Sequence, residues 1–360
     1  MTDPIRVGVI GCGEIAQVMH LRFIEELPDL ELAGLCDLSG SVLERLGARY
    51  RVDRLYTAYE ELVRDPGIDA VVVATPDHVG PALAALEHGK HLLLEKPAAY
   101  SVADADVIAE AASRAPSIAM MGYMRVYDPG YELVRSQTQS MVAMRLVRSH
   151  NFGGSFQRHQ ALFPLLRPES TENIGDGFAE ILSSGTARIL ERTVGPEPAV
   201  QRLFWSLLMG STHDLSITRD LIGPPQEIIY SHVDGTRLLA CISHARAVCT
   251  LEWETAGGYE WWDQEITVYG PESTCTARFA DPYIPYLPTA VTVHDLEQDT
   301  SATRQLDVSS ESAFRREWLH FIECIRSGRV PRTTVLGGRQ DVELIAELVS
   351  RGTAMRGGAA

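Results

Sequence analysis

The chain has 360 residues, of which 45 % are hydrophobic and 22 % are charged, a composition typical of soluble globular proteins. This length favours two domains over one, and no apolar stretch is long enough to span a membrane. The net charge of −16 argues against nucleic acids and anionic membrane surfaces as partners.

The first predicted elements are a strand, a glycine turn and a helix. Arg6–Ile10 is typical of a buried strand and Ile15–Leu27 of a helix. Between them the sequence fits G-x-G-x-x-G/A, whose glycines permit a tight turn and a close approach of the backbone to a diphosphate. Phosphates bind well at such helix N-termini. A glycine turn without a ligand is the alternative. We expect a dinucleotide held by Gly11, Gly13, Glu14, Ile15 and Ala16.

The second predicted strand indicates which dinucleotide binds. Glu31–Cys36 ends at Asp37, about twenty residues after the glycine motif, where a carboxylate hydrogen-bonds the ribose 2′-hydroxyl of NAD. No Lys or Arg follows until Arg45, so a 2′-phosphate has no obvious partner. The sequence predicts NAD(H) as the preferred cofactor and leaves NADP(H) open.

Helices and strands continue to alternate to about residue 122. This rhythm predicts a doubly wound parallel Rossmann sheet, whose ligands bind beyond the carboxyl ends of strands. Expected helices are Ser41–Tyr50, Pro81–His88 and Val102–Ala112, and expected strands are Ala70–Val73, His91–Leu94 and Ile118–Met121. Further candidates for cofactor or substrate contact at or near strand ends are Ala74, Thr75, Pro76, His78, Glu95, Lys96, Tyr123, Arg125 and Tyr127.

Lys96 has the clearest chemistry of these candidates. It precedes Pro97, which disfavours the helical conformation at Lys96 and can itself follow a cis bond. An ammonium fixed there can hydrogen-bond a carbonyl or alkoxide oxygen, and partial burial would lower its pKa. The alternative is an exposed lysine paired with Glu95. For His78, the alternative to cofactor contact is a structural role in the first turn of its helix.

After residue 122 the alternation stops. A run of strands suited to one antiparallel sheet is expected at Met141–Ser149, Gln226–Val233, Leu238–Ser243, Ala247–Glu254, Gln264–Tyr269 and Ser273–Phe279. Helices are expected at Met209–Leu221, Phe314–Ser327 and Asp341–Arg351.

The cysteines and histidines show no metal-binding pattern. The six cysteines contain no C-x-x-C pair and the histidines no ligand-like spacing, so we expect no metal site. Unpaired thiols are typical of a reducing compartment, and the first strand begins too early for a signal peptide. These features predict a cytoplasmic protein.

Several motifs together resemble the Gfo/Idh/MocA family of oxidoreductases. They are the glycine motif with Asp37, the region of His78, GKHLLLEKP (89–97), GYMRVYDPGY (122–131), GSTHDLSITRDLIG (210–223) and FRREWLHFIECIRSGRVPRTT (314–334). The resemblance implies a Rossmann domain at 1–122 and an α/β domain at 123–360 with a large, mostly antiparallel open sheet. The C-terminal helices can pack back on the first domain. A homodimer or homotetramer is also implied, because such sheets often join subunits.

The resemblance assigns the substrate proton to Lys96 and His213. An alcohol carbon gives hydride to the nicotinamide while His213 removes the hydroxyl proton and Lys96 stabilises the oxygen, and ketone reduction runs in reverse. Relatives usually carry an acid one turn before the histidine, where this chain has Met209. Asp214 is adjacent but points elsewhere on a helix. Either another residue, such as Asp176, orients His213, or the pH profile is unusual, or catalysis is weak. A structural helix histidine is the alternative.

The substrate is expected near Tyr123, Arg125, Tyr127, Met209 and His213, since Arg and Tyr can hydrogen-bond the hydroxyls of a polyol. The alternative for Arg125 is a surface ion pair with Asp128. The segment 151–201 is expected to be a long irregular insertion that shapes the substrate cleft. Its candidate contacts are Phe152, Phe156, Arg158, His159, Phe163 and Arg167.

These features predict an NAD(H)-dependent dehydrogenase or reductase of a sugar, glycoside or cyclitol. Two alternatives stay open. One is an enzyme that recycles a tightly held NAD and cleaves glycosides through a transient 3-keto sugar. The other is a non-catalytic NAD-binding regulatory subunit, which the replacement of the acid by Met209 would suit.

Overall fold

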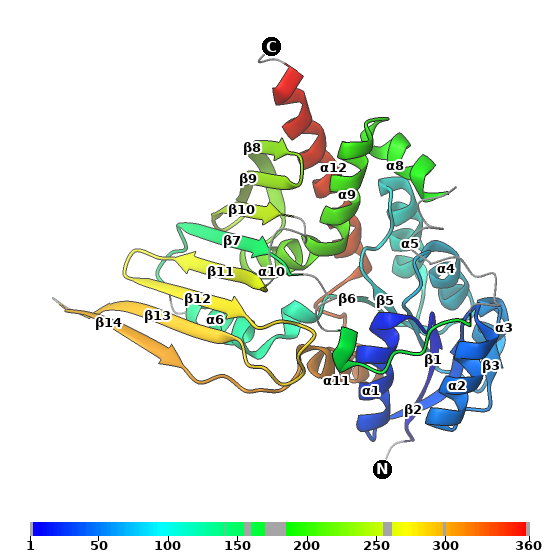
Figure 1. Cartoon of the computed structure of the whole chain (residues 1–360). Helices are drawn as coiled ribbons and strands as arrows, with labels where there is room; N and C mark the ends of the chain where they lie inside the picture. Colours follow the sequence, from blue (N-terminus) through cyan, green and yellow to red (C-terminus); the bar gives the residue numbers. More distant parts are fainter. Residues whose placement is uncertain are drawn as a thin grey trace. The chain divides into compact units, whose positions relative to one another are not determined.

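The computed structural model describes residues 3–139, 141–154, 160–169, 185–254, 261–297 and 300–357. Contacts divide the chain into two compact units (Figure 1). Unit 1 comprises Met1–Gly122, Gln160–Leu190 and Glu317–Val342, and unit 2 comprises Tyr123–His159, Glu191–Arg316 and Glu343–Ala360. Each unit is therefore assembled from three separate parts of the chain.

Unit 1 contains a six-stranded parallel sheet with strand order β3-β2-β1-β4-β5-β6, which confirms the predicted Rossmann topology. The strands are β1 (Ile5–Ile10), β2 (Leu30–Cys36), β3 (Leu55–Tyr56), β4 (Ala70–Val73), β5 (His91–Glu95) and β6 (Ala119–Gly122). The helices between them are η1 (Ala16–His20), α1 (Leu21–Glu26), α2 (Gly40–Tyr50), α3 (Tyr59–Arg64), α4 (Val79–Glu87) and α5 (Val102–Arg114). Strand order reverses between β1 and β4, where such sheets bind ligands.

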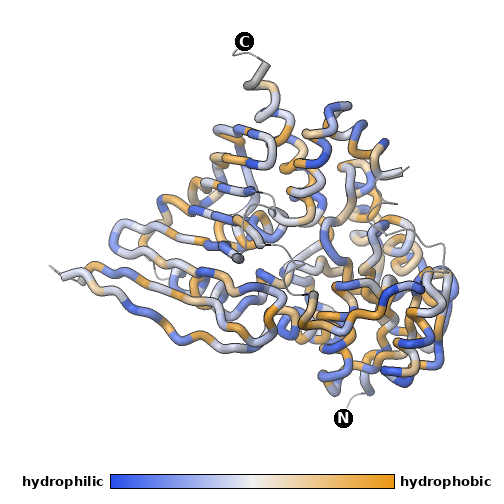
Figure 2. Tube along the Cα trace, in the orientation of Figure 1, coloured by the Kyte–Doolittle hydropathy of each residue, from blue (hydrophilic) through white to orange (hydrophobic). Residues whose placement is uncertain are grey.

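The central strands of this sheet are mostly apolar, as Figure 2 shows. All four residues of β4 have no exposed surface. Helices cover both faces of a parallel sheet, so both sets of alternating side chains are buried. The helix predicted over Ile15–Leu27 forms in two pieces, a π-helical turn (η1) followed by α1. The short elements β3 and α3 were not predicted, because two and six residues are too few to show a clear period.

Unit 2 contains an eight-stranded sheet with strand order β14-β13-β12-β11-β7-β10-β9-β8. Its neighbouring strands are antiparallel except β7 and β10, which confirms the predicted mostly antiparallel sheet. The strands are β7 (Leu146–Phe152), β8 (Pro225–Asp234), β9 (Arg237–His244), β10 (Val248–Glu254), β11 (Asp263–Tyr269), β12 (Ser273–Phe279), β13 (Ala290–Glu297) and β14 (Thr300–Leu306).

One predicted strand had the wrong limits, and one hairpin was not predicted. The strand predicted at Met141–Ser149 begins at Leu146 and runs to Phe152, because pairing with β10 and β11 sets its limits rather than the local apolar run. The hairpin of β13 and β14 was missed, since the described residues of β14 are mostly exposed and show no apolar alternation.

Helices cover one face of the eight-stranded sheet. They include α6 (Pro129–Gln139), which contacts β12 and β13, and α10 (Thr212–Ile222), which contacts β7. The last helix, α12 (Val335–Gly357), is tied to the sheet where the Ser231 hydroxyl donates to the Leu348 carbonyl over 2.7 Å. The other helices are η2 (Met124–Tyr127), η4 (Gln160–Leu162), α8 (Thr186–Val194), α9 (Pro198–Gly210) and α11 (Ala313–Ser327).

The single helix predicted over Met209–Leu221 is in fact the end of α9 followed by α10, with Ser211 between them. Gly210 sits at a close approach, because a Cβ there would lie 2.9 Å from the Trp253 ring. In the described residues, no helix is both long and apolar enough to cross a membrane. All six cysteines are free thiols, as predicted.

Candidate cofactor and active site

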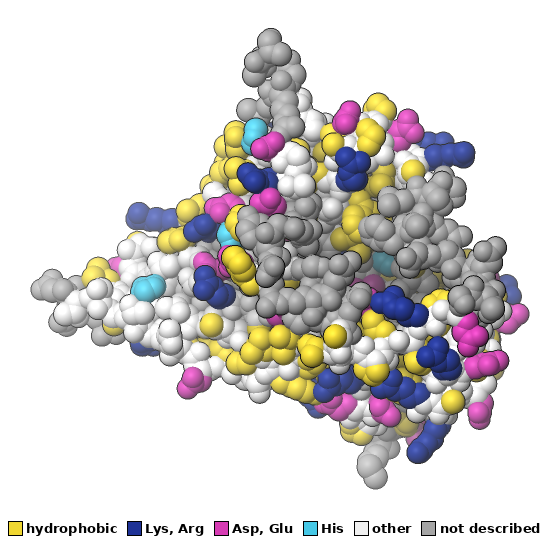
Figure 3. Space-filling model, in the orientation of Figure 1, with side chains coloured by type: hydrophobic (Ala, Val, Ile, Leu, Met, Phe, Trp, Pro, Cys, Tyr) yellow, Lys and Arg dark blue, Asp and Glu magenta, His cyan; other side chains and the backbone are white. Residues whose placement is uncertain are grey.

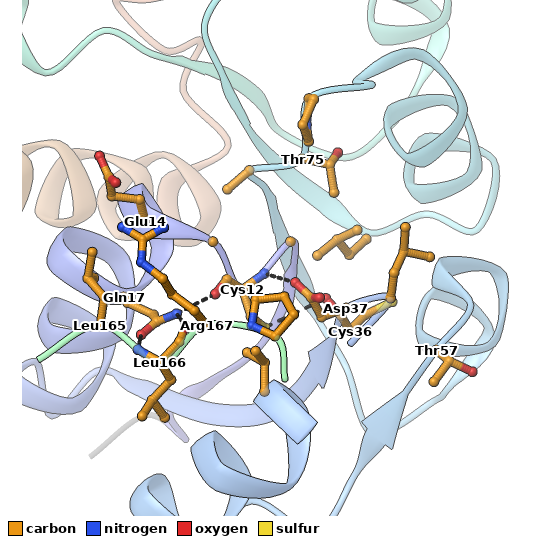
Figure 4. Close-up of a pocket in the computed structure, with 18 of the residues that line it drawn as sticks. Cys12, Glu14, Gln17, Cys36, Asp37, Thr57, Thr75, Leu165, Leu166 and Arg167 are labelled. Atoms are coloured by element: carbon orange, nitrogen blue, oxygen red, sulfur yellow. Dashed lines mark hydrogen bonds between the residues drawn. The ribbon is translucent and has the colours of Figure 1, made fainter. Parts of the chain in front are cut away.

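A pocket of about 630 Å³ lies beyond the carboxyl ends of β1, β2 and β4, within unit 1 (Figure 4). The glycine loop, the residues after β2, the segment after β4 and a stretch from later in the chain form its walls. The predicted residues that line it are Gly11, Gly13, Glu14, Asp37, Ala74, Thr75 and Pro76. The structure therefore brings most of the predicted cofactor residues together in one pocket.

The glycine loop has the geometry that a dinucleotide needs. Gly11 has a φ of +91°, and a Cβ there would lie 2.8 Å from the Ala74 carbonyl, so a side chain is excluded. A Cβ on Gly13 would meet nothing within 4 Å, so packing within the described residues does not require this glycine. Its missing side chain instead leaves room for the backbone to approach a diphosphate. Ala16 has no exposed surface at the start of η1.

Asp37 is fixed at the pocket wall by two backbone groups. Its carboxylate accepts hydrogen bonds from the amides of Cys12, over 2.7 Å, and Ser39, over 2.9 Å. The Ser39 hydroxyl in turn accepts from Val42 N and caps α2. The carboxylate that was predicted to bind a ribose is thus oriented between the glycine loop and α2.

The Lys96–Pro97 peptide bond, directly after β5, is cis, one of the two forms that the sequence allowed. The buried ring of His78 donates from Nδ1 to the Pro97 carbonyl over 2.5 Å, which supports a structural role in holding this turn. Burial lowers the pKa of Lys96, and the charge of Glu95 partly offsets this. Neither His78 nor Glu95-Lys96 is among the residues that line the 630 Å³ pocket.

Glu95 belongs to a buried polar cluster of unit 1. Its Oε1 lies 2.9 Å from His20 Nε2, and its Oε2 accepts from the Lys96 amide over 3.2 Å. The His20 ring packs edge-on against Trp318 with centroids 5.8 Å apart. Next to Trp318, Glu317 has no exposed surface, and within the described residues its carboxylate oxygens have no hydrogen-bond partner. Burial, with a smaller effect of the Glu95 charge, raises the pKa of Glu317 well above its usual value.

The raised pKa of Glu317 predicts a pH-dependent effect of Glu317→Gln on stability. The pKa of this carboxyl is about 4.3 in the unfolded chain and higher in the folded protein. Below about pH 4.3 the group is protonated in both states, and its contribution to the free energy of unfolding is fully present. As the pH rises toward the folded-state pKa, this contribution is lost. Glutamine stays neutral, so its advantage should be absent near pH 4 and should grow with pH. Urea unfolding between pH 4 and 8 measures this, with exposed Glu87→Gln as control. If the difference in the free energy of unfolding between Glu317→Gln and the wild type does not change with pH, Glu317 does not have a raised pKa in the folded protein.

In unit 2, His213 is half-buried in the first turn of α10. Its ring lies edge-on to the buried ring of Tyr123, with centroids 6.4 Å apart. Asp214, in contrast, accepts from Asn151 Nδ2 over 2.7 Å and from Gln264 Nε2 over 2.8 Å. Burial raises the pKa of Asp214 to about 6, although these two hydrogen bonds oppose the shift. The Asp214 carboxylate is therefore held by side chains of β7 and β11. This agrees with the expectation that neighbouring residues on a helix point in different directions.

Arg125 forms the ion pair with Asp128 that the alternative named, but the pair is buried rather than on the surface. It is 2 % exposed, its Nη1 lies 3.7 Å from Asp128, and it donates to the Ala280 carbonyl over 2.9 Å. Its guanidinium carbon lies 4.9 Å from the Phe279 ring centroid and 5.7 Å from that of Trp262. Tyr127 is also buried, at the end of η2, while Met209 is half-buried at the end of α9.

The segment 151–201 is only partly the irregular insertion that was predicted. Phe152 ends β7, and 186–194 and part of 198–210 form α8 and α9, whose apolar faces were not recognised. Phe156, Arg158, His159 and Asp176 lie outside the described residues. Leu165–Glu169 line the cofactor pocket of unit 1, with Arg167 among them. Their contribution could not be found from sequence, because the other lining residues lie far earlier in the chain, between Ile10 and Pro76.

The described residues contain no group of three or more His, Cys, Asp or Glu side chains that could hold a metal ion. The glycine loop, the oriented Asp37 and the parallel sheet together define a dinucleotide-binding Rossmann protein.

Comparison with known proteins agrees. Residues 5–123 match the GFO_IDH_MocA family model, described as an oxidoreductase family with an NAD-binding Rossmann fold. An inositol 2-dehydrogenase/D-chiro-inositol 3-dehydrogenase of Shouchella clausii is 33 % identical over 149 residues, which are 40 % of this chain and 43 % of that protein. The scyllo-inositol 2-dehydrogenase (NAD(+)) of Bacillus subtilis is 27 % identical over 133 residues, or 36 % and 39 % of the two chains.

Residues 5–123 are thus similar to the NAD-binding Rossmann region of the Gfo/Idh/MocA family of oxidoreductases. The matched region spans about two-fifths of the length of these curated relatives. The fold agrees over almost the whole chain. A 3-ketoreductase from Actinomadura kijaniata, solved in complex with TDP-benzene and NADP, superposes with a TM-score of 0.69 at 18 % identity and covers 95 % of this chain and 96 % of its own.

Proposed function

We propose that this protein is an NAD(H)-dependent oxidoreductase that acts on a secondary alcohol or ketone of a sugar, glycoside or cyclitol. The observation that carries the proposal is the pocket in which Gly11, Gly13 and Asp37 converge, in a chain whose curated relatives include inositol dehydrogenases. The negatively charged carboxylate of Asp37 can accept a hydrogen bond from the 2′-hydroxyl of NAD, whereas it would repel the 2′-phosphate of NADP. The described residues fit the cofactor, because Gly13 leaves its side-chain position open.

When bound, the nicotinamide supplies the hydride acceptor or donor. The proton chemistry belongs to the chain. His213 removes the hydroxyl proton during oxidation and returns it during reduction, since an imidazole titrates near neutral pH. Lys96 donates a hydrogen bond to the reacting oxygen and favours its alkoxide character. Its lowered pKa suits this role, because an ammonium that is closer to neutral pH transfers a proton more readily.

The test is NADH formation at mildly alkaline pH with NAD or NADP and a panel of inositols, free pyranoses and aryl glycosides. The proposal expects NADH with one class of ring and a preference for NAD. Absence of NADH with every compound, in a protein that binds NAD, would contradict net dehydrogenation and favour either the enzyme that recycles its NAD or the regulatory subunit.

We also propose that the open face of the eight-stranded sheet joins two copies of the chain, as a homodimer or as part of a homotetramer. This face carries side chains of both charges. Arg148 donates to both carboxylate oxygens of Glu252 over 3.0 Å, and His150 lies 3.4 Å from Glu252 and 3.1 Å from Asp263. A twofold interface pairs a patch with itself, and a patch with both charges can be self-complementary. Figure 3 shows basic, acidic and histidine side chains dispersed over the strands of this sheet.

Thr276→Lys tests this interface. Thr276 lies on β12 on the face opposite to buried Cys275 and Ala277, and its hydroxyl contacts Thr267 over 3.0 Å. A twofold interface would place added lysines near each other, so sedimentation at micromolar concentration should show the wild type as an oligomer and the variant as mostly monomer. Wild-type protein of monomer size would overturn the proposal.

No nucleic-acid or membrane partner is proposed for a chain of charge −16. The six free thiols support a cytoplasmic location.

A further inference from the structure

The outer wall of the cofactor pocket is a strap, which we define as residues 163–169. Within unit 1, its backbone is tied by hydrogen bonds to η1 and to α2. The side-chain amide of Gln17, in η1, accepts from Leu166 N over 2.8 Å and donates to Leu166 O over 2.9 Å. The amide of Glu169 donates to the Ser41 hydroxyl of α2 over 3.3 Å. The strap thus reaches from η1, beside the glycine loop, to α2, beside Asp37 (Figure 4).

Gln17 connects the strap to the glycine loop itself. Its Nε2 also donates to the Cys12 carbonyl over 2.8 Å, so one side chain bridges the loop and the strap. This pairing with the backbone N–H and C=O of one residue, Leu166, uses both the oxygen and the nitrogen of the Gln17 amide. It fixes where Leu166 and the next residue, Arg167, lie. Hydrogen bonds of this kind position a backbone segment without covalent connection.

Arg167 differs in charge from the other charged side chains that line the pocket. Among the described residues that line the pocket, Glu14, Asp37 and Glu169 are acidic and Arg167 alone is basic. Figure 4 shows the Arg167 side chain extending from the strap toward Glu14, at the entry to the helix that follows the glycine loop. That helix N-terminus is where backbone N–H groups receive a diphosphate. An acidic pocket that holds a doubly negative diphosphate gains most from a cation at this point.

We propose that Arg167 is a cofactor-binding residue that supplies the cation for the diphosphate, and that Gln17 is the positioning residue that holds the strap and Arg167 over it. The inference rests on the proposed dinucleotide cofactor and adds a second wall to its site. The strap must move aside for the cofactor to leave, so Gln17 sets the dissociation rate as well as the affinity. An ion pair of Arg167 with Glu14 alone, without a role toward the cofactor, is the competing interpretation.

The first test is Arg167→Gln, which keeps most of the side-chain length and removes the charge. The dissociation constants of NAD and of ADP-ribose, measured by calorimetry without substrate, should both rise about tenfold, because both ligands carry the diphosphate. Wild-type affinity should fall more steeply with added salt than that of the variant. The control is Arg49→Gln, which removes an equal charge from the exposed end of α2.

The second test is Gln17→Leu, which keeps the volume of the side chain and removes its hydrogen bonds. Displacement of NADH by excess NAD, followed by fluorescence, should be several times faster than in the wild type. Arg167→Gln in the Gln17→Leu background should add less than it does alone, because Gln17 acts through the strap. The melting temperature of each variant identifies any loss of fold.

The outcomes separate this inference from the proposed function. If the wild type binds NAD and Arg167→Gln binds it equally well, the role of Arg167 is wrong while the cofactor proposal stands. If the two substitutions are additive, the positioning role of Gln17 is wrong. If the wild type binds neither NAD nor ADP-ribose, the proposed cofactor itself fails.

Discussion

Replacing Lys96 by methionine should lower turnover about 10³-fold while NAD still binds, because the removal of one proton-handling group from an active site typically costs 10²- to 10⁴-fold. Methionine keeps the length and apolar stem of lysine but has no donor. Lys96 follows the buried strand β5 and does not line the dinucleotide pocket, so the affinity for NAD should change little. Steady-state rates with the best substrate of the panel, together with NAD titration, measure both quantities.

His213→Asn, in unit 2, tests the second proposed proton-handling residue in the same way as Lys96→Met tests the first. Asparagine can hydrogen-bond but cannot take a proton at neutral pH, so turnover should fall by a comparable factor. If both residues act on the same proton, the double variant should lose little more than either single one. Turnover within threefold of the wild type in Lys96→Met would remove this lysine from the chemistry, whatever the substrate.

Replacing Asp37 by serine should weaken NAD binding roughly 10- to 100-fold, because a charged acceptor for the ribose hydroxyls is lost. In the structure this carboxylate accepts from Cys12 N and Ser39 N, so it is held at the pocket wall before any ligand arrives. The same change removes a negative charge that would repel a 2′-phosphate. The affinity for NADP should therefore rise relative to that for NAD.

Calorimetry with NAD and NADP at one ionic strength checks the Asp37 prediction, with Asp53→Ser as a control at an exposed acid. A ratio of NAD to NADP affinity that stays constant would show that Asp37 does not select the cofactor. Loss of both affinities together would instead indicate that the carboxylate is needed to shape the glycine loop.

The sequence predicted the parallel sheet and its pocket well because the signals are local. Apolar runs such as Ala70–Val73 identify buried strands, and the glycine spacing has a direct backbone cause at Gly11. The acid after β2 was found because its distance from the glycine motif follows from the βαβ unit. Each of these inferences needed only a stretch of about thirty residues.

Sequence reasoning missed features that depend on contacts between distant parts of the chain. Gln17 and Leu166 are 149 residues apart, and neither belongs to a motif, so nothing indicated the strap. The burial of Arg125 could not be seen in the sequence, because its partners include Phe279, at the end of β12, and the next residue, Ala280, more than 150 residues later. Hairpin β13–β14 was missed because β14 has little apolar surface to bury.

Transfer of deuterium from a sugar or cyclitol carbon to the nicotinamide would show that the protein oxidises such rings. Protein with stoichiometric NAD is mixed with C-deuterated myo-inositol, glucose or an aryl glucoside, quenched within the first turnover, and the cofactor is analysed by mass spectrometry. We expect deuterium on the nicotinamide with one of these ring classes, even if the cofactor is later recycled and no NADH accumulates. Bound NAD that stays unlabelled with all three would contradict an oxidoreductase that acts on such rings.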